Sequence, residues 1–183
     1  MNLPGTKEVS GQTSWKNLGL PDIRDISVAP TASPVRELPG AVDFDSALKQ
    51  VALGFGLQED MDTVWVDTPY VPVIVRRRYL LHIVEKRPNA RERFTEFAVD
   101  TVRNPLEIWR VLYSDGSYRL AFIGAYAAKY QMLVVINVDH GQVLWNFMNC
   151  DKKHSTSTDM AIWFISDAWP PKNEKSSPRA AFF

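Results

Sequence analysis

Apolar residues recur at helical spacing in three stretches of the chain, residues 43–53, 78–86 and 89–102. Because positions three or four apart lie on one side of a helix, each stretch predicts a helix with one buried face. The positions that share a face are Phe44, Leu48 and Val51 in the first stretch, Leu80, Ile83 and Val84 in the second, and Phe94, Phe97, Ala98, Thr101 and Val102 in the third. Asn89 is the predicted N-cap of the third helix, with Glu92 as its reciprocal capping partner.

The hydrophobic period changes to two after Asn104-Pro105, which indicates β-strands. The predicted strands cover residues 108–113, 118–123, 132–138, 143–147 and 161–165. Asp115-Gly116 between the first two strands favours the positive φ angles of a tight hairpin turn. The residues expected on one face of the fourth strand are Val143, Trp145 and Phe147.

The order of these elements predicts the fold class. Residues 64–75 are interrupted by Pro69 and Pro72, so they are expected to form an extended segment at a sheet edge. Helices followed by strands, without a βαβ crossover, favour an α+β fold. We expect two helices packed on one face of a four- to five-stranded, mostly antiparallel sheet, with the other face or its rim open for a site.

Proline, glycine and small polar residues divide the chain into four parts. Residues 1–40 are predicted to be a flexible tail, 41–60 a short helix and connector, 61–168 the α+β domain, and 169–183 a second tail. Three apolar residues of the first tail are able to dock on the domain or on a partner, namely Trp15, Leu18 and Leu20.

The composition excludes several classes of protein. The 21 basic residues balance the 21 acidic ones, so any argument for nucleic acid must be local. Cys150 is the only cysteine, which excludes an internal disulfide and a cysteine-rich zinc site. No apolar run approaches the roughly 20 residues that span a bilayer, and no secretory signal is apparent. A cytoplasmic protein without a membrane partner is therefore expected.

The first candidate for chemistry is His82. The three histidines show no metal-ligand spacing with one another or with acids, so no metal and no cofactor is expected. His82 lies among cations, which are Arg76, Arg77, Arg78, Lys86, Arg87 and Arg91. Two interpretations remain open. The histidine carries a proton while the cations hold a phosphodiester, or the stretch is a solvated basic face whose histidine completes the packing.

The second candidate is the polar loop over residues 151–158, between the last two predicted strands. Its lysines, histidine and hydroxyls can all contact phosphate, although a plain solvent-exposed loop explains them as well. The residues that come into question here and on the neighbouring strands are Lys153, His154, Thr156, Ser157, Lys129, Arg110 and Arg119.

Several short motifs together resemble the phage-associated branch of the barnase, EndoU, colicin and RelE nuclease superfamily, over residues 64–165. Such domains occur at the C-terminal ends of Mu-F-like phage head morphogenesis proteins and in prophage-encoded polyproteins. The motifs are Thr68-Pro69-Tyr70, residues 81–87, residues 91–94, Thr101, residues 104–109, Phe122-Ile123, residues 132–135, Gly141 and Asn146-Phe147.

The resemblance implies a barnase- or RelE-like fold and metal-independent cleavage of RNA, with tRNA as one possible substrate. It implies His82 as the catalytic histidine, and the hydroxyl-bearing loop of the superfamily corresponds loosely to Thr156 and Ser157. Lys129 is added as a catalytic candidate, because it lies close to the position of a superfamily lysine without being equivalent to it. The RNA contacts expected from the basic residues themselves are Arg77, Arg78, Arg110, Arg119, Lys153 and His154. The implied partners are RNA and either an immunity protein or a phage head protein. The implied locations are the cytoplasm, a virion, or a target cell into which the domain is delivered as a toxin.

Two positions depart from the pattern of this superfamily. A lysine usually follows the Phe-Ile pair, where this chain has Gly124, and an arginine and a glycine usually precede the last strand, where it has Asp159-Met160. The alternative function is therefore a catalytically degenerate phage structural or interaction module with the same fold.

Overall fold

The fold is described from a computed structural model, and the description covers residues 7–20, 35–85, 91–126, 130–138, 141–151 and 163–164. The helices are α1 (Phe44–Gly54), α2 (Arg77–Glu85), the 3₁₀ turn η1 (Glu92–Phe94) and α3 (Thr95–Arg103). The strands are β1 (Thr63–Val66), β2 (Val73–Arg76), β3 (Glu107–Leu112), β4 (Tyr118–Ala125), β5 (Tyr130–Asn137), β6 (Val143–Asp151) and β7 (Trp163–Phe164). The predicted α+β class is confirmed.

The strands form one sheet in the order β1-β2-β6-β5-β4-β3-β7. All neighbours are antiparallel except β2 and β6, which are parallel and pair at Ile74 and Val143. The prediction of four or five strands was therefore too low for the described part of the chain. The difference lies between α1 and α2, where a hairpin of β1 and β2 replaces the single extended segment.

The two prolines explain that difference. Pro69 and Pro72 lie in the loop between β1 and β2, where a missing backbone donor does no harm to a ladder. The Thr68 hydroxyl stabilises the loop, because it accepts from the Tyr70 and Val71 amides at 3.2 and 3.1 Å and donates to the Val71 carbonyl at 2.7 Å.

The predicted helices are present, with shifted ends. Asp43 caps α1 through a 2.7 Å hydrogen bond from the Ser46 amide. Hydrogen bonding from the Ser46 side chain, and then from this amide, lowers the pKa of the Asp43 carboxyl.

The third helical stretch begins with η1 at Glu92, where Arg91 precedes it without a side-chain cap. The Glu92 carboxylate is fully buried and accepts from the Ala41 amide at 3.4 Å. Asn89 lies outside the described residues, so its predicted contact with Glu92 stays a prediction.

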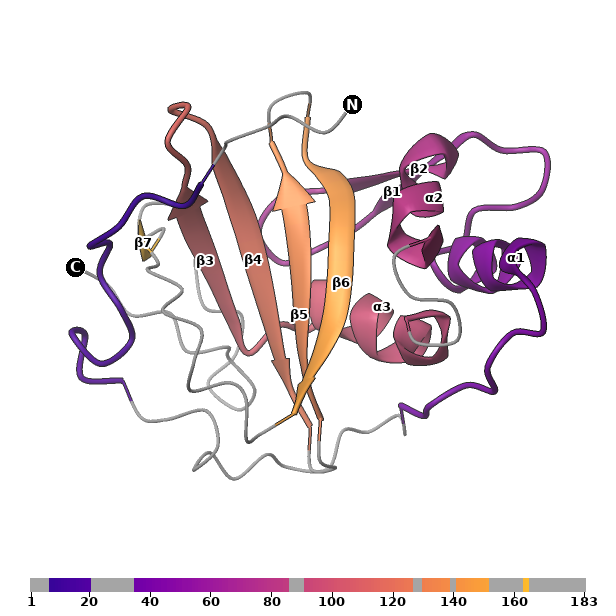
Figure 1. The fold of residues 1–183 in the computed structure, drawn as a ribbon, viewed down its shortest axis with the longest axis horizontal. Coiled ribbons are helices and arrows are strands. Elements are labelled where there is room, and N and C mark those ends of the chain that lie inside the picture. Colours follow the sequence, from indigo (N-terminus) through magenta and orange to yellow (C-terminus); the bar gives the residue numbers. More distant parts are fainter. Residues whose placement is uncertain are drawn as a thin grey trace.

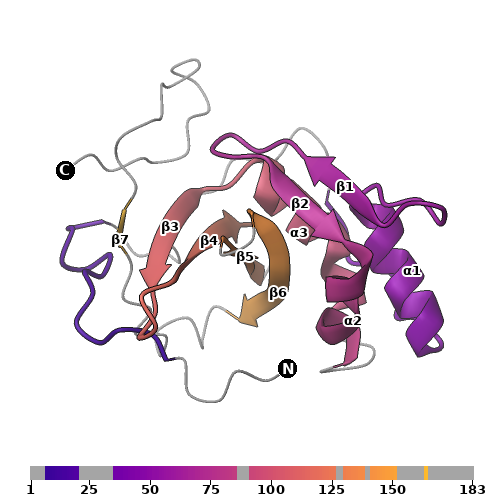
Figure 2. The ribbon, with the colours of Figure 1, turned by 90° about the horizontal axis from the view of Figure 1, so that it is seen from above.

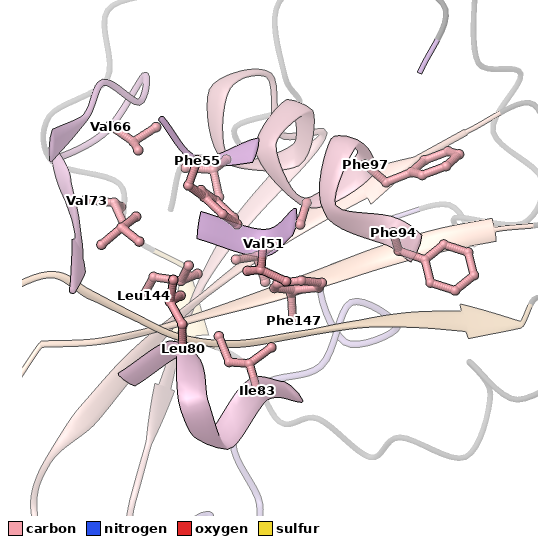
Figure 3. Close-up of a cluster of buried hydrophobic side chains, with 14 of the residues drawn as sticks. Val51, Phe55, Val66, Val73, Leu80, Ile83, Phe94, Phe97, Leu144 and Phe147 are labelled. Atoms are coloured by element: carbon pink, nitrogen blue, oxygen red, sulfur yellow. The ribbon is translucent and has the colours of Figure 1, made fainter. Parts of the chain in front are cut away.

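The main core lies between the helices and one face of the sheet. Its members include the predicted helical positions Val51, Leu80, Ile83 and Phe97, together with Phe147 of β6 (Figure 3). These side chains are at most 4% exposed, so their burial supplies the principal stabilisation of the domain.

The opposite face of the sheet has a smaller core of its own, made of Trp109, Val111, Ala121 and Leu133. Residues 7–20 lie against it, and the three tail residues singled out above pack on these four side chains. Figure 2 shows this segment and the helices on opposite sides of the curved strands, with the same sheet in the foreground of Figure 1.

Gln12 attaches this N-terminal segment to β3. Its side-chain amide donates to the Leu112 carbonyl at 3.0 Å and accepts from the Leu112 amide at 2.8 Å, as a neighbouring strand would. The sheet face that the sequence leaves open for a site is therefore partly covered by the chain itself.

Candidate functional site

The site begins with a β-bulge in β6. Val135 of β5 pairs with Asn146, and the next residue, Ile136, pairs with Leu144, so Trp145 is an extra residue between the two pairs. Such a bulge turns a side chain away from the regular alternation of a strand.

The bulge overturns one prediction. Val143, Trp145 and Phe147 do not line one face, because the extra residue changes the phase of the strand. Leu144 and Phe147 both reach the main core, whereas Trp145 lies beside His82 of α2. 

α2 carries His82 to this bulge. The helix buries its apolar stripe in the main core, which leaves His82 at its border, partly exposed. The His82 Nε2 atom lies 2.5 Å from the Trp145 carbonyl oxygen, and the two rings are 4.8 Å apart at their centroids. A carbonyl only accepts, so Nε2 must carry the hydrogen, and Nδ1 is the atom of the neutral ring that takes up a proton.

Two arginines flank this pair of rings. The Tyr79 ring lies 5.6 Å from the Trp145 ring, and the Arg78 guanidinium lies 4.7 Å from the Tyr79 centroid. From the sheet, the Arg119 guanidinium lies 5.8 Å from the Trp145 centroid. Together with His82, the residues Arg78, Tyr79, Arg119 and Trp145 form what we call the His82 cluster.

Arg119 is itself held by Tyr113. Its guanidinium lies 4.3 Å from the Tyr113 ring centroid, and its Nη1 donates to the Tyr113 hydroxyl at 3.5 Å. Burial raises the pKa of Tyr113, against the opposing effect of the Arg119 charge, and the hydroxyl donates to Glu8 of the N-terminal segment at 3.5 Å. Tyr113 therefore presents a neutral ring to the cation.

The cluster combines the groups that recognise single-stranded nucleic acid. Guanidinium groups bind phosphates, and exposed aromatic faces stack on bases. Of the residues predicted for the site, the structure brings together His82, Arg78 and Arg119. Sequence reasoning missed Trp145, Tyr79 and Tyr113. The only available signal was an aromatic residue next to Arg78, because nothing in the sequence announces a bulge.

Two other predicted arginines lie elsewhere. Arg77 donates to the backbone carbonyls of Gln58 and Met61, with its Nε atom 3.1 Å from the Met61 oxygen, so it fastens the loop before β1 to the start of α2. Arg110 lies on the helix-covered face of the sheet, with its guanidinium 4.1 Å from the Tyr118 ring centroid.

The remaining predicted residues are not placed. Lys129, Lys153, His154, Thr156 and Ser157 lie outside the described residues. Their roles stay predictions from the sequence.

Gly124 has a structural reason in this fold. A Cβ atom at this position would come 2.2 Å from the Thr101 hydroxyl oxygen and 2.9 Å from a ring carbon of Tyr126. The Thr101 and Tyr126 hydroxyls are hydrogen-bonded to each other at 2.8 Å, so neither yields easily. A lysine would not fit here without a change in the packing of α3 on β4.

The described residues contain neither a metal-binding cluster nor a membrane-spanning helix. No group of three or more His, Cys, Asp or Glu side chains within them is arranged to hold a metal ion. None of the helices among the same residues has the length and apolar character to cross a membrane.

The chain matches one known family. Residues 50–160 match the model of the family described as phage-Barnase-EndoU-ColicinE5/D-RelE like nuclease2, and this region contains α2, the whole of β3–β6 and the His82 cluster. No curated protein and no solved structure matches the chain. Since the family model covers more than half of the 183 residues, the resemblance seen in the sequence is confirmed, and the chain belongs to this family of phage nuclease-like proteins.

Proposed function

We propose that the chain is a metal-independent endoribonuclease, encoded by a phage or prophage, in which His82 transfers protons. One observation carries the proposal. The Trp145 carbonyl orients the His82 ring, and the Arg119 guanidinium lies 5.8 Å from the ring centroid of the same tryptophan. A histidine that can carry a proton and a cation thus both lie next to Trp145. Cleavage of a phosphodiester needs both groups.

The proposed reaction needs only the RNA itself as nucleophile. A base removes the proton of a ribose 2′-OH, the 2′-oxygen bonds to phosphorus, and the bond from phosphorus to the 5′-oxygen breaks. An acid gives the leaving 5′-oxygen its proton, so the products end in a 2′,3′-cyclic phosphate and a 5′-OH. His82 serves as this base or acid through Nδ1, and Arg119 stabilises the charge that builds up on the phosphoryl oxygens.

The other proposed residues complete the site. Thr156 and Ser157 are assigned to it from the hydroxyl-bearing loop of the superfamily, and Lys129 because it lies close in sequence to the position of a superfamily lysine. Lys153 and His154 are assigned to RNA contacts because their side chains can bind phosphate. Arg78 is exposed beside Tyr79 and is assigned to the RNA backbone. Arg77 and Arg110 are not assigned to the His82 cluster, since the Arg77 guanidinium donates to the Met61 carbonyl and the Arg110 guanidinium stacks on Tyr118.

The test compares wild-type protein with His82→Ala on total RNA and on tRNA in EDTA. We expect cyclic phosphate ends from the wild type and a loss of about 100-fold or more in the variant, the usual contribution of an acid or base. Leu81→Ala is the matched control, because Leu81 is exposed on the same helix. Equal cleavage by wild type and His82→Ala would refute the role of His82, and intact RNA in every reaction would refute the ribonuclease.

Gly124 favours a second candidate, an interaction module that keeps the fold without catalysis. The lack of room for a lysine at this position removes one cation that the superfamily usually supplies. This candidate predicts no cleavage of any RNA and stable binding to a phage head protein. The ribonuclease instead predicts an immunity protein that blocks the site, and action in the cytoplasm of the cell that it enters. Co-purification with head proteins, in the absence of cleavage, would decide for the module.

A further inference from the structure

Arg91 connects the two elements that meet at the His82 cluster. Its Nη1 atom donates to the Ile83 carbonyl at 3.2 Å and to the Asn146 side-chain oxygen at 2.8 Å. Ile83 follows His82 in α2, and Asn146 follows Trp145 in the bulge of β6. A single guanidinium nitrogen therefore donates hydrogen bonds to the residue after His82 and to the residue after Trp145.

The contact with Ile83 has a clear physical basis. The described part of α2 reaches Glu85, so the Ile83 carbonyl lies in the last described turn of the helix. Arginine side chains satisfy such carbonyls and also interact favourably with the negative end of the helix dipole.

The contact with Asn146 fixes the bulge. A bulge residue lies outside the regular hydrogen-bond ladder, so its carbonyl direction depends on side-chain contacts nearby. Because Arg91 only donates, the side-chain oxygen of Asn146 must face it, which also settles the orientation of this amide. The Asn146 amide thereby holds the peptide that follows Trp145, whose carbonyl is the acceptor for His82.

We propose that Arg91 and Asn146 are positioning residues that keep the His82 ring in the tautomer with its hydrogen on Nε2. They touch no substrate in this scheme. They hold the Trp145 carbonyl and the end of α2 in register, so that the basic nitrogen of the neutral ring is Nδ1. The inference deepens the proposed ribonuclease, but the arrangement of the ring is a property of the free protein and can be measured without RNA.

The experiment records the ¹⁵N shifts of the histidine rings in the full chain, in buffer about two units above the ordinary histidine pKa of about 6.5. His82→Gln assigns the signal. Arg91→Met and Asn146→Leu remove the donor and the acceptor while preserving most of the side-chain volume. Asn146→Asp keeps an oxygen at the same place, and Arg93→Met is the matched control, because Arg93 forms its ion pair with Glu37 instead.

We expect one dominant tautomer, with the hydrogen on Nε2, in the wild type, in Arg93→Met and in Asn146→Asp. Arg91→Met and Asn146→Leu should give mixed tautomers with an otherwise native spectrum. In RNA cleavage the same two variants should lose on the order of tenfold in kcat at nearly unchanged KM, as misplacement of a reacting group does.

Two outcomes would overturn the proposal. One is a wild-type ring with its hydrogen on Nδ1, and the other is an unchanged tautomer in both Arg91→Met and Asn146→Leu. A wild type that has the expected tautomer and yet cleaves no RNA would instead refute the proposed function and leave the positioning role intact.

Discussion

Two arginine–tyrosine pairs lie at the same end of the β3–β4 hairpin, on opposite faces of the sheet. In one, Arg119 stacks on Tyr113 and also adjoins Trp145, and in the other, Arg110 stacks on Tyr118. The chemistry of the two pairs is the same. Only the first pair contacts Trp145, which in turn contacts His82. The residues around a pair, rather than the two residue types in it, therefore decide whether it belongs to the His82 cluster.

The sharpest way to break this comparison is to neutralise each arginine in turn. We expect Arg119→Gln to lower kcat/KM for a labelled oligoribonucleotide by about 100-fold, because it removes a charge aimed at the transition state. Arg110→Gln should cost about fivefold or less, as is usual for an exposed charge. Equal losses in initial-rate measurements would show that the two faces are not distinct.

Removal of the tyrosine rings should give a smaller effect. Tyr113→Leu frees the Arg119 guanidinium, and the lost cation–π contact of about 1 kcal/mol corresponds to about fivefold in kcat/KM. Tyr118→Leu is the control on the other face. Tyr113→Phe keeps the ring and should retain nearly all of the activity, and a large loss in that variant would shift the role from the ring to the hydroxyl.

The salt dependence of RNA binding offers a test without catalysis. In a His82→Ala background, Arg119→Gln should reduce the slope of log K against log salt by about 0.7, which is the contribution of one neutralised phosphate on a single strand. Arg110→Gln should leave the slope unchanged. Fluorescence anisotropy with a short single-stranded RNA at several salt concentrations measures both slopes.

The smallest effect concerns stability at alkaline pH. Burial raises the pKa of Tyr113 in one pair and of Tyr70, which lies near the other pair, above the ordinary value of 10.0. Each hydroxyl binds its proton more tightly in the folded state, so its contribution to stability is complete below pH 10 and is lost as the pH rises through the folded-state pKa. Urea unfolding between about pH 9 and pH 11 should show a shallower loss in Tyr113→Phe and in Tyr70→Phe than in the wild type. An unchanged slope in both variants would contradict the raised pKa values.

The parts of the fold that follow from local pattern were predictable. The stripe of Leu80, Ile83 and Val84 located α2, and Asp115-Gly116 located the hairpin, where Gly116 has a φ of 82° and its amide is bonded to the Tyr113 carbonyl at 3.0 Å. These signals lie within a few residues, and the structure follows them. His82 could be singled out for the same reason, since its cations precede and follow it closely along the chain.

The parts that depend on distant residues were not predictable. The parallel contact of β2 with β6 joins two strands from opposite ends of the region that matches the family. The hydrophobic pattern of neither strand indicates which strand is its partner. The bulge at Trp145 is set by the pairing of β6 with β5, so alternation alone put this residue on the wrong face. Gly124 is a similar case, because its meaning depends on Thr101 of another element.

The pairing of β2 with β6 also determines when the sheet can be completed during synthesis on a ribosome. The chain is synthesised from its N-terminus, so α2 with His82 emerges long before the strand that carries Trp145. Pairings between distant segments form late and slowly, since a long loop must close before the contact rewards it. A growing chain that has not reached β6 therefore has the histidine but no acceptor to orient it. The His82 cluster is therefore complete only when nearly the whole region that matches the family has left the ribosome.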